Sequence, residues 1–251
     1  MATAGALIVR RMYGRALINM LERENYSLIL RSAGNLNFND MATINYLKTK
    51  LTDRNDPNSV IITVSLLLEG LGKDAIPLLE PILHDAEPDL RAAVLDVLVD
   101  SDVRGDSTRR LYVDLLKDQD WRIRKRALLG LETLASPPDA DYLEAAVALL
   151  DDTDEEIRAQ VIPVLLRTPH ENVARAALAR LVYSHDPRLR SLGASALGRV
   201  TNPQYLEMLL NCLGDPVESV HLDAVMSLEM VVSRIDVPSG YVGNLAGKLR
   251  L

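Results

Sequence analysis

A short sequence pattern recurs along the chain at a nearly constant spacing, and a fixed period of this length constrains a fold more than any other feature. The pattern is an acid, two variable residues, an aliphatic residue and an arginine. It occupies residues 87–91, 120–124, 154–158 and 186–190. The four arginines lie 33, 34 and 32 residues apart, and 31 residues further in either direction stand Val60 and His221. The sequence therefore predicts six units of the same structure.

Each occurrence of the pattern is expected to open a helix. The aliphatic residue before the arginine and the small or aliphatic residues three, six and seven positions after it form one face at helical spacing. The acid can accept hydrogen bonds from the first free amides of the helix. Pro57, Pro88 and Pro187 fall at the first helical position, where the missing N–H has no helical partner in any case.

A second apolar segment with helical periodicity precedes each of these helices. The six segments span residues 41–51, 75–83, 108–116, 141–150, 171–181 and 203–213. No stretch alternates as a half-buried strand would, so each unit is predicted to be a helical hairpin. A single hairpin cannot bury both its faces, and stacking makes one continuous core. The predicted fold is all-α, a curved α-solenoid or superhelix of about six hairpins.

This pattern resembles HEAT repeats of the short bacterial type, over about residues 41–233. The resemblance implies that the second helices line a concave, partner-binding surface. Unit one departs from the pattern at Val60, and unit six departs at His221 and at Val217, which replaces the acid. End units of a solenoid are commonly atypical. Two further prolines, Pro81 and Pro163, fall inside predicted helices and are expected to kink them.

The two ends of the chain fall outside the repeat. Residues 1–31 carry a net charge of +3, against −10 for the rest, and residues 7–30 are amphipathic. We therefore predict an N-terminal helical cap or linker over residues 1–40. Residues 240–251 resemble the first helix of another unit, so residues 234–251 are expected to hold the start of a further helix or a C-terminal cap, as in a fragment of a longer chain.

The basic start also bears on attachment to a membrane. Residues 13–17 and the apolar first unit, residues 56–67, are similar to the soluble HEAT extension of bacterial transporters of the ADP/ATP-carrier type, over about residues 9–100. Arg10, Arg11 and Arg15 follow directly on an apolar stretch, a combination that suits the cytoplasmic side of a membrane. The alternative is a solvated cap whose apolar side covers the first repeat.

Composition and motifs exclude several classes of function. The 251 residues are 48% hydrophobic and 25% charged, as in a soluble globular protein, and no segment is long and apolar enough to span a membrane. A net charge of −7 opposes nucleic-acid binding. One cysteine, Cys212, cannot form an internal disulfide, which favours the cytoplasm. Known catalytic motifs are missing. The HEAT-like iron hydroxylases bind their metal through several His-Glu pairs, whereas this chain has the single pair His170-Glu171. No catalytic residue, cofactor or metal site is predicted.

Candidate partner-binding residues lie on the second helices. We interpret the repeated arginines as structural, because each can bond an acid or backbone carbonyls of its own or a neighbouring unit. We call these repeated arginines the arginine ladder. The basic residues around the single tryptophan are additional to this ladder. Apolar residues also recur one, five and eight positions after the arginines, where the concave face is expected. The predicted partner-binding residues are Trp121, Arg122, Lys125, Leu129, Leu166, Leu222 and Met226.

Two function classes remain open from the sequence. The first is a non-catalytic protein-interaction scaffold that binds a protein or peptide on the concave face, either free-standing or as the cytosolic domain of a larger transporter. The second is a HEAT-like enzyme or enzyme subunit, such as a bilin lyase-type protein. The oligomeric state is left open.

Overall fold

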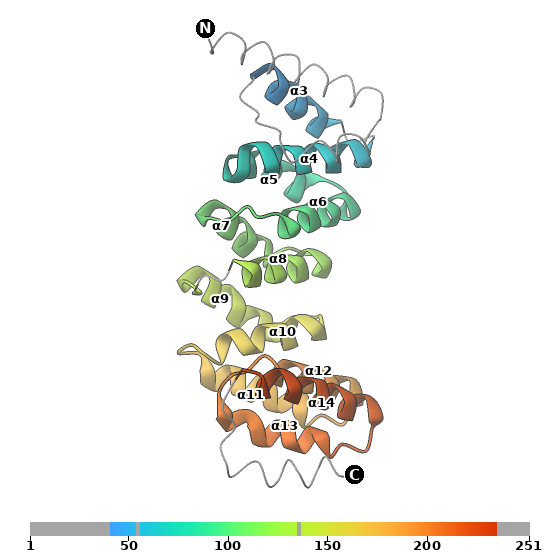
Figure 1. The fold of residues 1–251 in the computed structure, drawn as a ribbon, viewed down its shortest axis with the longest axis vertical. Coiled ribbons are helices and arrows are strands. Elements are labelled where there is room, and N and C mark those ends of the chain that lie inside the picture. The colour runs from blue at the N-terminus through green and yellow to red at the C-terminus, as the bar shows by residue number, and fades with distance from the viewer. Residues whose placement is uncertain (1–40, 54–55, 135–136, 235–251) are drawn as a thin grey trace. The chain divides into compact units, whose positions relative to one another are not determined.

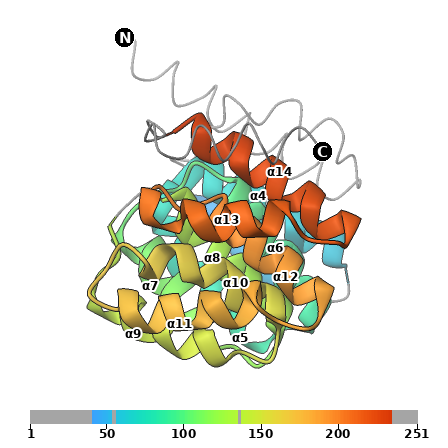
Figure 2. The same ribbon diagram turned by 90° about the horizontal axis from the view of Figure 1, so that it is seen from below.

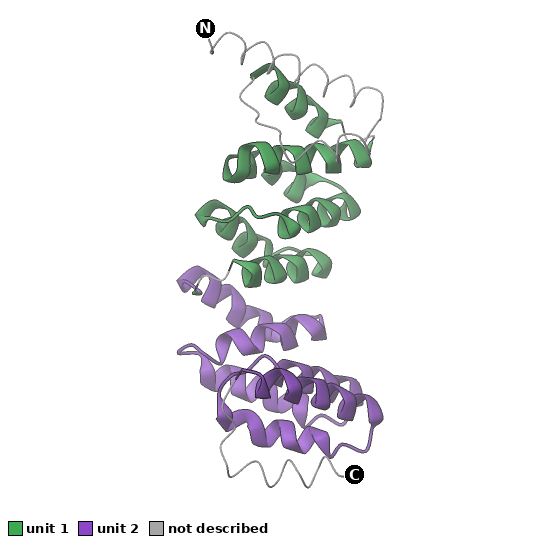
Figure 3. Cartoon of the chain, viewed as in Figure 1, with its two compact units in different colours: residues 1–137 green, residues 138–251 purple. Residues whose placement is uncertain are grey.

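A computed structural model describes residues 41–53, 56–134 and 137–234, and every regular element within these ranges is helical (Figure 1). The chain divides into two compact units, Met1–Pro137 and Pro138–Leu251 (Figure 3). The predictions for residues 1–40 and 235–251 lie outside the described residues.

The described part of unit 1 holds three helical hairpins. Second helices α4 and α6 pack on each other, as do α6 and α8, and each second helix packs on the first helix of its own hairpin. The elements are α3 (Met41–Thr52), α4 (Pro57–Leu71), the 3-10 helix η2 (Gly72–Ala75), α5 (Ile76–Asp85), α6 (Pro88–Asp100), α7 (Asp106–Leu115) and α8 (Trp121–Thr133).

Three more hairpins make up the described part of unit 2. Helices α10, α12 and α14 pack in succession, while α11 packs on α12 and α13 on α14 (Figure 2). The elements are α9 (Ala140–Ala148), η3 (Leu149–Asp151), α10 (Glu155–Leu165), α11 (Glu171–Val182), α12 (Pro187–Leu197), η4 (Pro203–Tyr205), α13 (Leu206–Leu213) and α14 (Glu218–Val232). The predicted all-α fold of stacked helical hairpins is confirmed, with three described hairpins in each unit.

Capping explains where most second helices begin. The carboxylates of Asp56, Asp120, Asp154 and Asp186 each accept a hydrogen bond from a first-turn amide of α4, α8, α10 and α12. The prediction fails for Glu87, whose side chain makes no capping bond to α6. Glutamate is not among the preferred capping residues, because its longer side chain places the carboxylate poorly for these amides. The two interior prolines lie inside α5 and α10 as predicted.

The core follows the predicted stripe closely. Residues three and seven positions after the arginines are buried, among them Val94 and Leu98 in α6 and Val161 and Leu165 in α10. Gly130 shows how tight this packing is, since a Cβ atom there would lie 2.5 Å from the ring of Tyr112 in α7. Small residues in the stripe therefore let the two helices of a hairpin approach each other.

Candidate interaction site

The repeated arginines join the two helices of their own hairpins. Each guanidinium donates hydrogen bonds to backbone carbonyls at or just after the end of the preceding helix, where carbonyls lack helical partners. In α6, Arg91 Nε lies 2.6 Å from the Leu83 carbonyl oxygen. The other accepting carbonyls are those of Asp118 and Gln119 for Arg124, Asp152 and Thr153 for Arg158, and Ser184 and His185 for Arg190.

Two of these arginines also bind the next repeat. Arg190 donates to both carboxylate oxygens of Asp215, at 2.6 and 2.9 Å, and Arg91 donates to the carboxylate of Asp118. Asp215 in turn accepts from the Val217 amide at 3.0 Å, and the hydrogen bond from Arg190 holds the pKa of this carboxyl below its usual range. The ladder is thus a set of structural links. The acids that pair with the ladder, Asp118 and Asp215, stand two residues before the N-cap residues of α8 and α14. We did not predict from the sequence that acids at this position pair with the arginines.

On α8, three of the predicted partner-binding residues lie along one face at helical spacing. Trp121 and Leu129 are each 46% exposed, which is high for such large apolar side chains. Lys125 lies between them, with its Nζ 5.9 Å from the centre of the Trp121 ring, a distance at which a cation and an aromatic face attract. The structure therefore brings Trp121, Lys125 and Leu129 together.

The neighbouring arginines of α8 are held by acids. Arg122 Nη1 lies 2.7 Å from Asp89 of α6, and its Nη2 lies 2.8 Å from Asp120. The hydrogen bond from Arg122 lowers the pKa of Asp120. Arg126 lies 2.5 Å from Asp96, also in α6. The Arg122 side chain predicted to bind a partner thus links two repeats, and the α8 face presents Trp121 and Leu129 beside paired charges.

In unit 2 two of the predicted partner-binding residues are exposed and one is buried. Leu222 and Met226 lie one turn apart on α14 and are 52% and 60% exposed. Leu166 is only 4% exposed, so its predicted place on the exposed face is wrong. Leu166 directly follows the last residue of α10. Because α10 packs against α9, α11 and α12, these helices cover more of its surface than the one buried face that the sequence pattern predicts.

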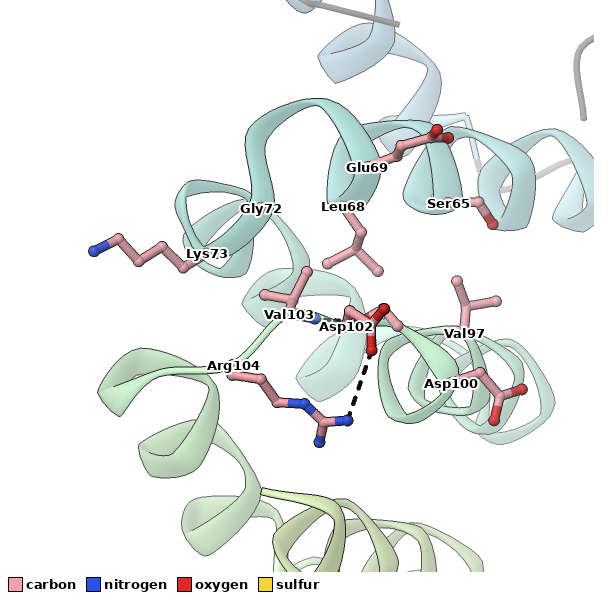
Figure 4. Close-up of a pocket in the computed structure, with 11 residues that line it drawn as sticks. Ser65, Leu68, Glu69, Gly72, Lys73, Val97, Asp100, Asp102, Val103 and Arg104 are labelled. Carbon is pink, nitrogen blue, oxygen red and sulfur yellow. Dashed lines mark hydrogen bonds and ion pairs between the residues drawn. The ribbon is translucent and has the colours of Figure 1, made fainter. Parts of the chain in front are cut away.

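A cavity that the sequence did not predict lies in unit 1, where α4 and α6 end (Figure 4). Its volume is about 750 Å³, within the range of ligand-binding pockets. Its lining combines the apolar side chains of Leu68, Val97 and Val103 with charged ones. No sequence motif marks it, because a cavity reflects how side chains of two repeats fail to fill the space between them.

The described ranges hold neither a metal-binding cluster nor a helix suited to a bilayer. Residues 41–53, 56–134 and 137–234 contain no group of three or more His, Cys, Asp or Glu side chains that could hold a metal ion. None of the helices in these ranges combines the length and the apolar character needed to cross a membrane. The carboxylate of Glu171, in the single His-Glu pair, accepts hydrogen bonds from Tyr205 at 2.8 Å and Gln204 at 2.6 Å and so links α11 to η4.

Stacked helical hairpins with arginine and aspartate at their junctions define an α-solenoid repeat protein. The family model of HEAT repeats matches residues 75–162 and 143–229, which together are more than half of the chain. The chain therefore belongs to the HEAT-repeat family.

Similarities to individual proteins are distant. No curated protein matches the chain. Among solved structures, human deoxyhypusine hydroxylase in complex with glycerol is 20% identical, with 77% of this chain and 75% of that chain covered and a TM-score of 0.37. An engineered protein is 18% identical, with 94% of this chain and 66% of that chain covered and a TM-score of 0.46.

Proposed function

We propose that the chain is a non-catalytic interaction module that binds a protein or peptide through the exposed faces of its second helices. The observation that carries the proposal is the face of α8, where Trp121 and Leu129 stay exposed while Arg122 and Arg126 are occupied by acids of α6. A cytoplasmic location is part of the proposal, since a single cysteine needs no oxidising compartment.

The α8 face has the chemistry of a binding hot spot. Tryptophan is enriched among the side chains that dominate interface energies, and such anchors are surrounded by contacts that exclude water. The ion pairs Arg122–Asp89 and Arg126–Asp96 hold α8 against α6. The helix that carries the apolar side chains is therefore fixed before binding, and little conformational entropy is lost when a partner binds. In unit 2, Leu222 and Met226 add further exposed apolar side chains on a second helix.

Partner binding can be tested with photo-crosslinking in the native host. A photoreactive amino acid at position 129 should capture a defined partner, while the same group at position 180 of α11 should not capture it, because Arg180 lies on an exposed first-helix surface. Leu129→Glu should reduce co-purification of that partner at least about tenfold without changing the melting temperature, since position 129 is exposed. Equal crosslinking at both positions would contradict the proposal.

We further propose that the module is the cytosolic part of a larger membrane transporter. The support is the charge asymmetry of the sequence, +3 over residues 1–31 against −10 elsewhere, with Arg10, Arg11 and Arg15 outside the described residues. Each basic residue near an anionic membrane surface contributes about 1 kcal/mol. The chain should co-sediment with anionic but not neutral vesicles, and changing the three arginines to Glu should abolish this. Equal pelleting with both lipids would leave only the capping role for this segment.

An enzyme of the bilin lyase type is the alternative. A linear tetrapyrrole carries propionate carboxylates, and the cavity between α4 and α6 is lined by Glu69, Asp100 and Asp102, with Lys73 and Arg104 the only bases. Like charges oppose binding there. The cavity therefore favours the interaction module over this alternative.

A further inference from the structure

We infer that the groove between α4 and α6 binds a basic segment of a protein partner, with a lysine or arginine side chain placed in the 750 Å³ cavity. This inference rests on the proposed function and names a recognition site and a partner chemistry for it. The α4–α6 groove is defined by the residues that line two cavities between these helices.

The two cavities follow one another along the same pair of helices. A cavity of about 410 Å³ is lined by Ile61 of α4 and Ala93 of α6 near the beginnings of the helices. The larger cavity is lined by Ser65 and Val97, each four residues further on. Residues four apart lie on the same face of a helix. The cavities are therefore consecutive parts of one groove, which extends for about 20 Å at the rise of an α-helix.

The floor of the groove is apolar. In the larger cavity, Leu68, Val97 and Val103 point into the space between the helices (Figure 4). In the smaller cavity, Ile61, Leu90 and Ala93 contribute apolar surface. Aliphatic side chains, or the aliphatic stem of a lysine or arginine, would bury this surface.

The walls of the groove are acidic. The two linings contain six acids and two bases; the acids are Glu69, Asp85, Glu87, Asp89, Asp100 and Asp102, and the bases are Lys73 and Arg104. Asp89 is paired with Arg122, and Asp102 lies 3.9 Å from Arg104.

Among the described residues, the two bases leave two acids of the larger cavity without a partner. The side chain of Lys73 extends away from the other labelled residues (Figure 4). Arg104 donates a hydrogen bond to the Thr133 carbonyl of α8 at 2.6 Å and lies 3.9 Å from Asp102, so its charge offsets that one acid. Within the described residues, Glu69 and Asp100 have no ion-pair or hydrogen-bond partner through their side chains.

The backbone adds to this preference for a cation. The larger cavity lies where α4 ends at Leu71 and α6 ends at Asp100, and helix C-termini carry partial negative charge. A cationic side chain would therefore meet two carboxylates and two helix ends of the same sign. An apolar floor with acidic walls selects a segment in which basic residues stand beside aliphatic ones.

The test is a peptide selection on the full chain, followed by affinity measurements. A displayed random library of about 12 residues, long enough to span the groove as an extended chain, is selected on the immobilised protein. Labelled peptides from the selection are then titrated by fluorescence polarisation. The groove variant is Glu69→Gln, Asp100→Asn and Asp102→Asn together. The matched control is Glu80→Gln, Glu144→Gln and Glu207→Gln, which removes the same charge from exposed positions outside the groove.

The inference predicts peptides rich in Lys and Arg beside aliphatic residues. Their Kd should rise at least about tenfold for the groove variant and stay within about twofold for the control, with both variants folded by circular dichroism. Replacing the basic residues of the peptide by citrulline and norleucine should abolish binding.

Five outcomes would overturn the inference. Neutral or acidic peptides, or equal losses for the groove variant and the control, would remove the groove as a basic-segment site. Peptide binding could instead be lost in Trp121→Ala and Leu129→Glu and unchanged in the groove variant. This result would support the proposed function but place peptide recognition on α8. Tighter binding by a synthetic peptide of residues 7–31 than by any selected peptide would make the chain's own segment the occupant. A library that yields no peptide would count against both proposals.

Discussion

The junction between α12 and α14 is closed, whereas the junction between α4 and α6 is hollow. At the first, a Cβ atom on Gly198 would lie 2.6 Å from Met230 Cε and 2.8 Å from Ser227 Cβ, and Ser191 donates a hydrogen bond to Asp223. At the second, cavities of about 750 and 410 Å³ lie between the helices. The same repeat architecture therefore produces both a dense joint and an open groove.

Two local differences accompany this contrast. In the closed junction Arg190 of the ladder bridges to Asp215 of the next repeat, and a glycine lets the helices approach. In the open junction the ladder position is Val60, a fully buried residue that cannot donate a side-chain hydrogen bond. The junction that has the ladder arginine and the glycine is thus closed, and the junction that has a valine at the ladder position is hollow.

The largest effect is expected when the closed junction loses its ion pair. Arg190→Ala leaves Asp215, whose side chain is 10% exposed, without its guanidinium partner and should lower the free energy of unfolding by about 3 kcal/mol. Urea denaturation followed by circular dichroism measures this. The control is Arg188→Ala, which removes an exposed guanidinium and should cost less than about 0.5 kcal/mol. Equal losses would show that the ladder does not hold the junction.

Filling the closed junction should have the next largest effect. Gly198→Leu places a side chain where Ser227 and Met230 already lie and should destabilise the protein by about 2 kcal/mol through overpacking. The melting temperature should fall accordingly. An unchanged melting temperature would mean that α12 and α14 can move apart at little cost in free energy, and this junction would then not be densely packed.

Acid should weaken the same junction in a predictable direction. Because Arg190 lowers the pKa of Asp215, the pair stabilises the fold fully above the ordinary aspartate value of 3.8, and this contribution is lost as the pH falls through the lower folded value. Asp215→Asn should therefore be less stable than the wild type at pH 7, and the gap should close in acid. Thermal melts across this pH range measure the gap, and a constant gap would contradict the linkage.

The smallest effect is expected in the open groove. Ala93→Leu adds a side chain beside the 410 Å³ cavity, where space exists, and should change the free energy of unfolding by less than about 0.5 kcal/mol. Comparison with Gly198→Leu tests the contrast directly, since both changes introduce the same side chain at a second-helix junction. A loss as large as that of Gly198→Leu would make the two junctions equally packed.

The sequence predicted what depends on near neighbours along the chain. Helix starts at Asp120 and Asp154 and the buried leucine column follow from caps and helical periodicity, which act within one or two turns. The burial of Leu166 was missed because it depends on how many helices surround α10. The partners of Arg122 and Arg126 lie 33 and 30 residues away, and the depth of the groove depends on side chains of two repeats at once.

The pairing of ladder arginine and loop aspartate also bears on how such chains change length. Arg91 meets Asp118 as Arg190 meets Asp215, so the chemistry of these two joints is supplied by adjacent hairpins. Removing the stretch from one ladder arginine to the next deletes one hairpin and again leaves an arginine facing the loop that follows it. Gene duplication and deletion in steps of one hairpin would therefore preserve joints of this kind, and the number of hairpins can evolve separately from the groove proposed to bind a partner.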